Sequence, residues 1–261
     1  MRAALVACGA WLAFAPVHAQ VSGSVGVVTD YRYRGYSLSA GDPALQASIA
    51  YDAASGVYGG LFASTTREEE GTGSQWIPYA GIARRDGAGR SWDVGVRYVH
   101  FTGEGTYLPP AYAEPAVSYD YLEAHVGVAF RRAAVRLHLA PDYYGAVPHA
   151  YLEADAHFTL GERVFGDRLQ LLLHGGLSQS GNTTQTVFIQ TSRYGVPSGY
   201  HARREGDRRR FDFSAGLALR TSLCDVQATW HHLGGSAMTA YAVPWDLYDR
   251  SGFVLGCTKR W

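Results

Sequence analysis

The stretch from Tyr121 to Ala140, YLEAHVGVAFRRAAVRLHLA, alternates apolar and polar side chains on either side of a short basic centre. Leu122 and Val126 share one face of an extended chain, whereas Glu123 and His125 share the other, because successive side chains of a strand point to opposite sides. After the basic centre the same alternation resumes. The stretch therefore predicts two antiparallel strands joined by a tight turn, with one apolar face and one ionisable face.

The same period of two returns along the rest of the chain, in segments of about ten residues separated by clusters of Gly, Pro, Asp and Ser. No strong amphipathic helix lies between the segments. Counting them predicts about twelve strands, to within two, and an even number is typical of single-chain bacterial barrels. The predicted strands are Val21–Arg34, Ala44–Asp52, Val57–Thr65, Gln75–Arg84, Trp92–Phe101, Tyr119–Phe130, Val135–Tyr143, Ala150–Leu160, Leu169–Ser178, Phe211–Thr221, Val226–His232 and Ser251–Trp261.

The connections between these strands are of two lengths. Short turns on one side of the sheet and long loops on the other are the arrangement of an outer-membrane barrel, with its turns in the periplasm. The expected short turns are Ala53–Gly56, Arg85–Arg90, Arg131–Ala134, Gly161–Arg168 and Ser222–Asp225, and the expected long loops are Thr102–Ser118, Gln179–Arg210 and Leu233–Arg250.

The apolar face of these strands indicates contact with lipid. Tyr and Trp gather toward the segment ends, as in the aromatic girdles that flank the lipid face of a membrane barrel, whereas a soluble sandwich favours larger residues in its core. In lipid every backbone polar group needs a partner, so the sheet has to close. The sequence predicts an all-β fold, a transmembrane antiparallel up-and-down β-barrel that forms one domain from residue 20 to residue 261.

The first nineteen residues have the features of a secretory signal. Arg2 is a short basic region, Ala3–Ala15 an apolar region, and Val17-His18-Ala19 a cleavage site of small-residue type before Gln20. We expect cleavage between Ala19 and Gln20 and localisation in the outer membrane of a Gram-negative bacterium. Cys8 ends a stretch similar to a lipoprotein box, but the hydrophobic sequence before it is too short for that interpretation.

The last predicted strand has its own alternation. Phe253, Leu255, Cys257, Lys259 and Trp261 share one face, and the final residue is aromatic. Outer-membrane barrels usually end in an aromatic residue, more often Phe than Trp. We therefore expect the barrel-assembly machinery to bind the strand that ends at Trp261.

Residues near the start of the predicted barrel resemble the TorF family of porins. The similar stretches are Thr29–Ser37 (TDYRYRGYS), Pro43–Gln46 with Tyr51, and Ser55–Ser64 (SGVYGGLFAS). They cover about the first quarter of the chain that follows the signal; beyond them only the strand rhythm and the C-terminus agree. The resemblance implies an outer-membrane barrel with passage of small solutes, and it brings no catalytic residues.

The polar faces of the strands point into the predicted lumen and carry ionisable groups of both signs. Such groups form either a pore constriction, in which Arg faces Asp and Glu, or a salt-bridged plug. Arg32 and Arg34 are the best constriction candidates, because their spacing on the first strand points both inward beside Asp30. The pore-lining candidates are Asp30, Arg32, Arg34, Asp52, Arg97, Glu123, Arg136, Glu153, Asp155 and Arg220.

The function that we expect is a porin-like channel for passive diffusion of small polar solutes. A non-conducting structural or adhesive barrel is the alternative, in which Arg203, Arg204 and residues 208–210 contact lipopolysaccharide phosphates or form a solvated rim. A formal net charge of zero argues against nucleic acid as a partner. The expected partners are therefore outer-membrane lipids, lipopolysaccharide, small solutes and the assembly machinery.

A lipid-modifying enzyme is a weaker alternative. His231, His232 and His100 are candidate bases, but no Gly-x-Ser-x-Gly motif is present and adjacent histidines of a strand point to opposite faces. The inward histidines lie on separate strands without the close spacing of zinc motifs. We expect no catalytic residues, no metal and no cofactor.

Two cysteines follow the signal segment. Cys224 falls in a predicted periplasmic turn, and Cys257 lies near the periplasmic end of the last strand, which pairs with the strand that begins at Val226. The two side chains are therefore expected to be neighbours. In the oxidising periplasm they are candidates for a disulfide.

Overall fold

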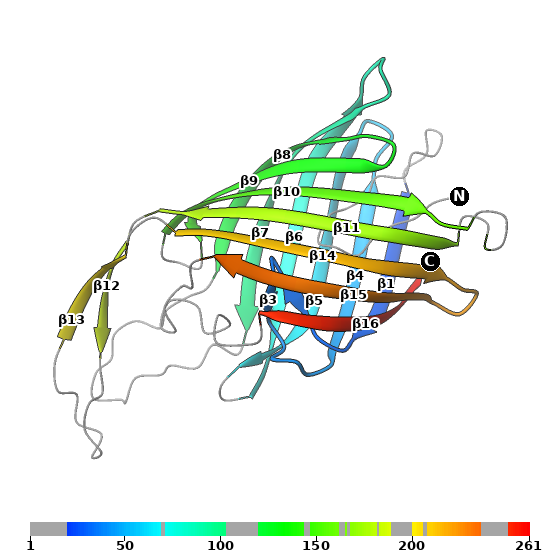
Figure 1. Ribbon diagram of the computed structural model, residues 1–261. Coiled ribbons are helices and arrows are strands. Elements are labelled where there is room, and N and C mark those ends of the chain that lie inside the picture. The colour runs from blue at the N-terminus through cyan, green and yellow to red at the C-terminus, as the bar shows by residue number, and fades with distance from the viewer. Residues whose placement is uncertain are drawn as a thin grey trace.

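The computed structural model describes residues 20–68, 71–102, 120–143, 147–161, 165, 168–181, 183–188, 200–205, 208–235 and 250–261. These residues form a closed antiparallel barrel in which each strand pairs with the next along the chain and the last pairs with the first (Figure 1). The twelve strands of the barrel are β1 (Gln20–Val28), β4 (Ala44–Asp52), β5 (Val57–Glu68), β6 (Gly71–Arg85), β7 (Ser91–Thr102), β8 (Tyr121–Ala129), β9 (Ala133–Tyr143), β10 (Val147–Thr159), β11 (Leu169–Ser180), β14 (Arg208–Arg220), β15 (Asp225–Gly235) and β16 (Ser251–Arg260).

The twelve predicted strands are confirmed, and Ala44–Asp52 has the predicted bounds. Outside the barrel, β12 (Thr183–Phe188) and β13 (Tyr200–Glu205) form a hairpin that projects from one end (Figure 1). The described residues of the five short turns lie at the other end, which we call the turn end, together with Gln20 and Trp261. The opposite end is the loop end. Among the described residues no helix is long and apolar enough to cross a bilayer.

One of the short turns shows how its polar residues fix the chain. The side chain of Asp86 accepts hydrogen bonds from the backbone amides of Ala88 and Arg90 and from the Arg90 guanidinium. The Arg90 hydrogen bond is the main reason why the pKa of Asp86 is lowered to about 2. Because an Asp side chain that bonds the backbone two residues on is a turn former, this sequence stops β6 and starts β7.

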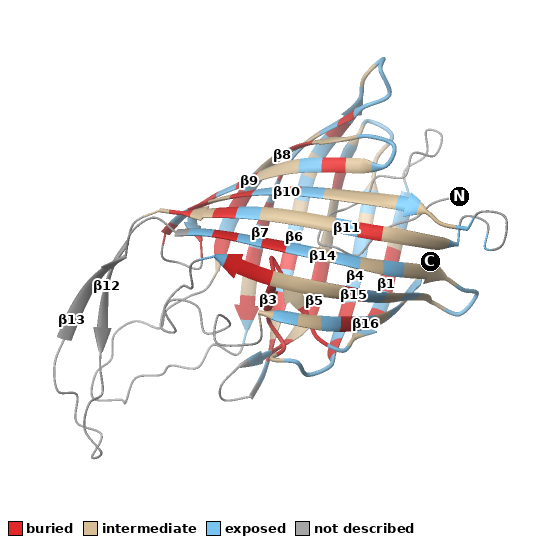
Figure 2. Ribbon diagram, viewed as in Figure 1, coloured by how far each residue is buried: buried red, intermediate tan, exposed pale blue. Residues whose placement is uncertain are grey.

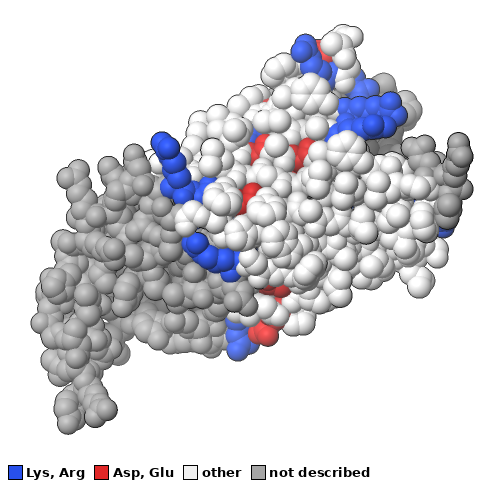
Figure 3. Space-filling view, viewed as in Figure 1, with Lys and Arg blue, Asp and Glu red and all other residues white. Residues whose placement is uncertain are grey.

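The outer face of the barrel is apolar. Leu137, Leu152 and Leu177 are neighbours across β9, β10 and β11, and every barrel strand carries a large apolar side chain that is more than a third exposed. Exposed stretches recur along the strands in Figure 2, and most of the wall seen in Figure 3 is uncharged, with its Lys and Arg toward the two ends. An exposed apolar surface of this extent is the lipid-facing band of a membrane barrel.

The seam between β1 and β16 closes the barrel. Its ladder is short, from Ser24 paired with Arg260 to Val28 paired with Gly256. Beyond it, the backbones of Gly23 and Trp261 exchange two hydrogen bonds of 3.2 and 3.1 Å. The Trp261 indole occupies the space that a side chain at Gly23 would need, because a Cβ there would lie 2.6 Å from the ring. A glycine at position 23 thus lets the last residue cover the seam.

The prediction of a first strand from Val21 to Arg34 is wrong beyond Val28, where β1 ends. Residues 29–43, which we call the lumen segment, instead fold into the barrel and form the small hairpin of β2 (Arg32–Tyr33) and β3 (Tyr36–Ser37). Alternation over a continuous strand, with Arg32 and Arg34 pointing inward, would place Tyr31 and Tyr33 on the lipid face, but both are buried there at 3% exposure. They belong to an apolar cluster inside the loop end that also contains Tyr36, Leu38, Ala44, Phe62, Ile77, Val99, Phe101, Tyr121, Ala140, Tyr143 and Leu233.

Asp30 causes the change of direction after β1. Its carboxylate accepts hydrogen bonds from the hydroxyls of Ser37 and Ser39 at 2.5 and 3.1 Å, and from the backbone amide of Gly41 at 3.3 Å. The tip of the hairpin needs positive φ angles at two successive residues, 51° at Arg34 and 82° at Gly35, and glycine adopts this conformation without steric cost. The alternating pattern continues through these residues, but the local hydrogen bonds of Asp30 end the strand.

The structure joins Cys224 and Cys257 by a disulfide with a Cα–Cα distance of 5.8 Å. Cys257 pairs with Val226 on one side and with Val27 of β1 on the other. The disulfide therefore ties the turn before β15 to the last strand, next to the seam.

We predict that Leu152→Arg lowers the free energy of unfolding by about 2–4 kcal/mol, because it places a guanidinium group on the lipid face. The matched control is Ala88→Arg, which adds the same group to an exposed turn. Urea unfolding in lipid vesicles measures both. Equal effects of the two substitutions would show that Leu152 does not face lipid.

We also predict that the denatured, unreduced protein without residues 1–19, which contain Cys8, has no thiol that reacts with an alkylating reagent, because Cys224 and Cys257 are bonded. After reduction two thiols should react, and gel mobility should change. Two reactive thiols before reduction, with unchanged mobility, would exclude the disulfide.

Candidate functional site

Glu123 of β8 is the centre of the polar lumen and is completely buried. Its Oε1 accepts a hydrogen bond from Arg97 Nε at 2.6 Å, and its Oε2 accepts one from Arg34 Nη2 at 2.6 Å. The Nδ1 atom of His138 lies 2.8 Å from Oε1. One carboxylate thus holds two guanidinium groups, one from the barrel wall and one from the lumen segment.

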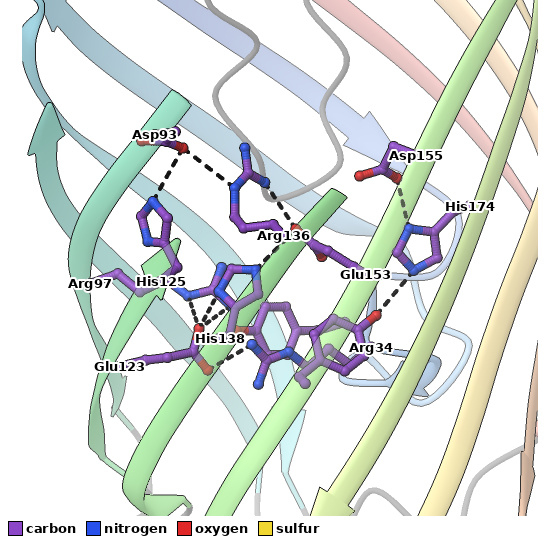
Figure 4. A network of polar contacts seen from close by, with 12 residues as sticks. Arg34, Asp93, Arg97, Glu123, His125, Arg136, His138, Glu153, Asp155 and His174 are labelled. Atoms are coloured by element: carbon purple, nitrogen blue, oxygen red, sulfur yellow. Dashed lines mark hydrogen bonds and ion pairs between the residues drawn. The ribbon is translucent and has the colours of Figure 1, made fainter. Parts of the chain in front are cut away.

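A second layer of the same network extends toward β7 and β10. Arg136 donates to Glu153 at 2.9 Å and lies 3.4 Å from Asp93, and His138 Nε2 lies 3.0 Å from the same Glu153 oxygen. His125 contacts Asp93 at 3.3 Å. These side chains converge from neighbouring strands in Figure 4, so that positive and negative groups alternate along one continuous network.

Strand register produces most of these contacts. Arg97 is the direct cross-strand partner of Glu123, and Arg136 is that of Glu153. Opposed inward residues of an antiparallel pair are close enough for their side chains to interact. The alternation of each strand and the register fixed by the short turns therefore suffice to pair these charges.

A smaller cluster lies on β10, β11 and β14. His174 contacts Asp155 through Nδ1 at 2.7 Å and Asp212 through Nε2 at 3.0 Å. The Tyr151 hydroxyl lies 3.0 Å from His174 and 3.1 Å from Asp212. Tyr151 also contacts Arg34, whose guanidinium carbon lies 4.3 Å from the centre of its ring. Tyr151 therefore links this cluster to the network around Glu123.

The lumen segment is anchored to the wall through Arg34. Its guanidinium group hydrogen-bonds Glu123 and lies over the rings of Tyr33, Tyr143 and Tyr151, at 5.3, 5.6 and 4.3 Å from their centres. A buried cation of this kind is stable only with a paired anion and aromatic contacts, because the loss of hydration is costly. The segment is thus held against β8, β9 and β10.

The predicted pore-lining residues occupy four places. Arg34, Arg97, Glu123, Arg136 and Glu153 form the network, and Asp155 belongs to the smaller cluster. Asp30 and Arg32 pair with each other within the lumen segment, 2.7 Å apart. Asp52 and Arg220 lie near the turn end. Asp52 lies opposite Gln20 in the backbone register of β4 and β1, and Arg220 Nε lies 3.8 Å from the Asp225 carboxylate.

Arg32 and Arg34 do not point to one place from a common strand, so this prediction is wrong. Arg34 reaches Glu123 on β8, whereas the guanidinium group of Arg32 lies beside Gly252 on β16, 2.8 Å from where a Cβ would be. The reason is the hairpin turn at Arg34 and Gly35, which replaces the extended chain. Both arginines lie in the lumen, but on different sides of it.

Several inward residues escape prediction from sequence. Tyr58 hydrogen-bonds Asp93 at 2.5 Å, and Tyr151 and Asp212 bridge the smaller cluster. As a residue type tyrosine favours the lipid boundary, but the even-numbered position of Tyr58 on β5 points inward. Asp212 lies within the predicted strand and faces inward with the other even-numbered residues of β14, which its numbering could have shown.

The basic residues 208–210, which directly precede the predicted strand Phe211–Thr221, are not all exposed. Arg209 is exposed and donates to Gln179 at 2.8 Å, but Arg210 is buried, with its guanidinium carbon 5.1 Å from the centre of the Tyr36 ring. The expectation that Arg210 forms a solvated rim or contacts lipopolysaccharide is therefore wrong, because β14 begins at Arg208 and position 210 faces inward. The side chains of Arg203, Arg204 and Arg208 lie outside the described residues.

Glu153, Asp155 and His174 each bring one ligand atom to within 4.8 Å of the others, a spacing that suits a metal ion. However, Glu153 already contacts Arg136 and His138, and His174 bridges two carboxylates. A cation there would compete with these groups. The contacts are therefore better explained as ion pairs than as a metal centre.

The candidate bases of an enzyme are dispersed. His100 contacts Asp120 at 2.6 Å, His231 faces the lumen, and His232 contacts the Ser251 hydroxyl at 2.7 Å among Phe211, Phe213 and Trp230. Catalysis by Ser and His needs a third group to orient the base. Among the described residues no carboxylate contacts His232, so this pair supports no catalytic assignment.

The fold and its lumen define a closed twelve-stranded barrel of the type found in outer-membrane channels. A family model described as "Bacterial protein of unknown function (Gcw_chp)" matches residues 13–186, and the chain belongs to this Gcw_chp family. The TorF name is not among the matches. No curated protein matches the chain.

Solved structures with a similar fold include outer-membrane channels. The TodX monoaromatic hydrocarbon channel (deltaS2 mutant) aligns at a TM-score of 0.51 and 10% identity, covering 95% of this chain and 89% of that one. An outer membrane channel from Pseudomonas putida F1 aligns at 0.45 and 10% identity, with 95% and 96% covered. OccAB3 from Acinetobacter baumannii aligns at 0.43 and 9% identity, with 93% of this chain but only 64% of OccAB3 covered.

We predict that Glu123→Gln lowers the free energy of unfolding by about 3–5 kcal/mol, because it leaves two buried guanidinium groups without their anion. Asp42→Asn is the control, since its pair with Arg67 is more than half exposed and is expected to contribute only about 0–1 kcal/mol. Urea unfolding in lipid measures both. A loss at Glu123 no larger than at Asp42 would contradict the network.

Proposed function

We propose that this protein is an outer-membrane channel that lets small polar solutes diffuse through a lumen narrowed by residues 29–43. The observation that carries the proposal is the pairing of an apolar exterior with an ionised interior inside one closed barrel. A barrel of about twelve strands is wider than those filled by wall side chains alone and narrower than the open porins of 16 to 18 strands. An inward-folded segment is therefore the part that sets its aperture.

The constriction that we propose is the cluster in which the Glu123 carboxylate binds both Arg34 and Arg97. It joins the lumen segment to the β7–β8 wall at buried positions, so that this side of the lumen is closed by side chains. Rings of Arg facing carboxylates set the charge preference and the diameter of an aqueous pore. Because the charges here are paired, we expect the channel with an intact network to discriminate only weakly between cations and anions.

The lumen chemistry favours polar solutes. TodX is named as a monoaromatic hydrocarbon channel, and its likeness to this chain concerns the fold. A hydrocarbon that crosses the lumen of this barrel would have to displace water from Arg, Glu, Asp and His side chains without replacing its hydrogen bonds, which is unfavourable. Small hydrogen-bonding molecules avoid this free-energy cost, because they replace the hydrogen bonds of the displaced water.

The proposal also places the protein in the outer membrane and gives its orientation there. Residues 1–19 act as the secretory signal, the turn end lies in the periplasm, and the strand that ends at Trp261 binds the assembly machinery. Outer-membrane lipids surround the apolar face, and lipopolysaccharide borders the loop end. The projecting β12–β13 hairpin is the feature that favours the second candidate, a non-conducting adhesive barrel with its binding surface outside the membrane.

We predict stepwise single-channel conductance for the refolded, heat-modifiable protein in a planar bilayer. Arg34→Ala should raise the conductance and shift the reversal potential toward cations, because Glu123 then loses one of its two guanidinium partners. Arg67→Ala is the control, since its side chain is exposed. If neither the folded wild type nor the folded Arg34→Ala variant shows conductance steps, the channel is overturned and the adhesive barrel is favoured.

A further inference from the structure

The lumen has two unlike sides. The ionised network covers the side formed by β7 to β11. On β15, β16, β1 and β4 the charged residues Asp52, Asp225 and Arg260 lie at the turn end, where Asp225 and Arg260 pair. Between the turn end and the lumen segment, the inward side chains of these four strands are small or apolar, or are amides, hydroxyls and an imidazole.

Ser24 and Ser48 bond each other across β1 and β4 at 2.7 Å. Gly26 faces Thr258, where any Cβ would lie 2.6 Å from the Thr258 hydroxyl. The β15–β16–β1–β4 side of the lumen therefore keeps open space, whereas charged side chains fill the space on the network side.

A cavity of about 90 Å³ lies on this second side, against the lumen segment. Its polar lining comes from Gln46, Gln227, Thr229, His231 and Thr258, and Val28, Tyr31, Phe62 and Val254 supply an apolar part. A water molecule needs roughly 10–15 Å³ of such volume, so the cavity accommodates about six waters or one small organic molecule.

Asp30 and Arg32 also line the cavity, but their charges are compensated. Arg32 Nε donates to Asp30 at 2.7 Å, and the same carboxylate accepts from Ser37, Ser39 and the Gly41 amide. The remaining polar groups are amides, hydroxyls and an imidazole. Gln227 and Thr229 lie side by side on one face of β15, 2.8 Å apart through a hydrogen bond. The cavity therefore offers neutral donors and acceptors more than a charged partner.

We propose that uncharged, hydrogen-bonding solutes of about the size of glycerol cross along the β15–β16–β1–β4 side, and that this cavity is the subsite that selects them. The inference rests on the proposed channel function and adds its path and its solute class. Amide and hydroxyl groups replace the water of a polyol, whereas an ion loses hydration that paired charges do not restore.

The size and position of Gln227 allow a direct test. Gln227→Trp fills the cavity from β15, and Ala228→Trp places the same side chain one residue further on, on the exposed outer face. Liposome swelling at neutral pH in isosmotic glycerol and in isosmotic sodium glycolate gives the rates for an uncharged and a charged solute. We expect glycerol to enter faster than glycolate through the wild type, and Gln227→Trp to lower the glycerol rate on the order of tenfold.

Ala228→Trp should keep the wild-type rate. An unchanged glycerol rate in a folded Gln227→Trp protein would overturn the path, and equal rates for both solutes would overturn the solute class, while the channel itself would stand. A wild type that admits neither solute and shows no conductance would overturn the channel and this inference together. If Gln227→Trp does not fold, Gln227→Leu, which keeps the volume and removes the amide, should still slow glycerol severalfold, and an unchanged rate would again overturn the path.

Discussion

Closure of the sheet is the constraint on which the rest of the structure depends. A strand in lipid has no water for its backbone groups, so each must be paired with a neighbour and the last strand must find the first. In this chain the β1–β16 ladder is short, and it is supported by the Gly23–Trp261 hydrogen bonds and by the nearby Cys224–Cys257 disulfide. Once the barrel is closed, alternation sends every second side chain into a confined lumen.

Confinement determines what the inward side chains do. Charges that cannot reach bulk water need partners, and cross-strand register supplies them for Arg97 with Glu123 and for Arg136 with Glu153. Glu123 can hold a second guanidinium group, and the lumen segment provides it through Arg34. The network thus fixes the segment on one side, and the other side keeps a cavity with neutral polar walls. The proposed aperture and the proposed path follow from this asymmetry.

The sequence predicts the strands and the short turns well, because both depend on local chemistry: a period of two, and turn residues such as Asp86. It fails where side-chain hydrogen bonds or distant contacts override the alternating pattern. Alternation continues from Val28 through Arg34, but hydrogen bonds of Asp30 turn the chain inward. That Arg34 meets Glu123, 89 residues away, depends on the lumen fold and cannot be derived from spacing. Arg210 was assigned to a loop because its strand begins three residues earlier than the pattern indicates.

The central claim is that residues 29–43 are docked inside the barrel through Arg34 and Glu123. A double-mutant cycle with Arg34→Met and Glu123→Gln tests it most directly, with urea unfolding in lipid as the measurement. The account predicts a coupling free energy of about 2 kcal/mol, in the range found for residues in direct contact. Additive effects, with a coupling below about 0.5 kcal/mol as found for distant sites, would show that the segment does not dock on Glu123.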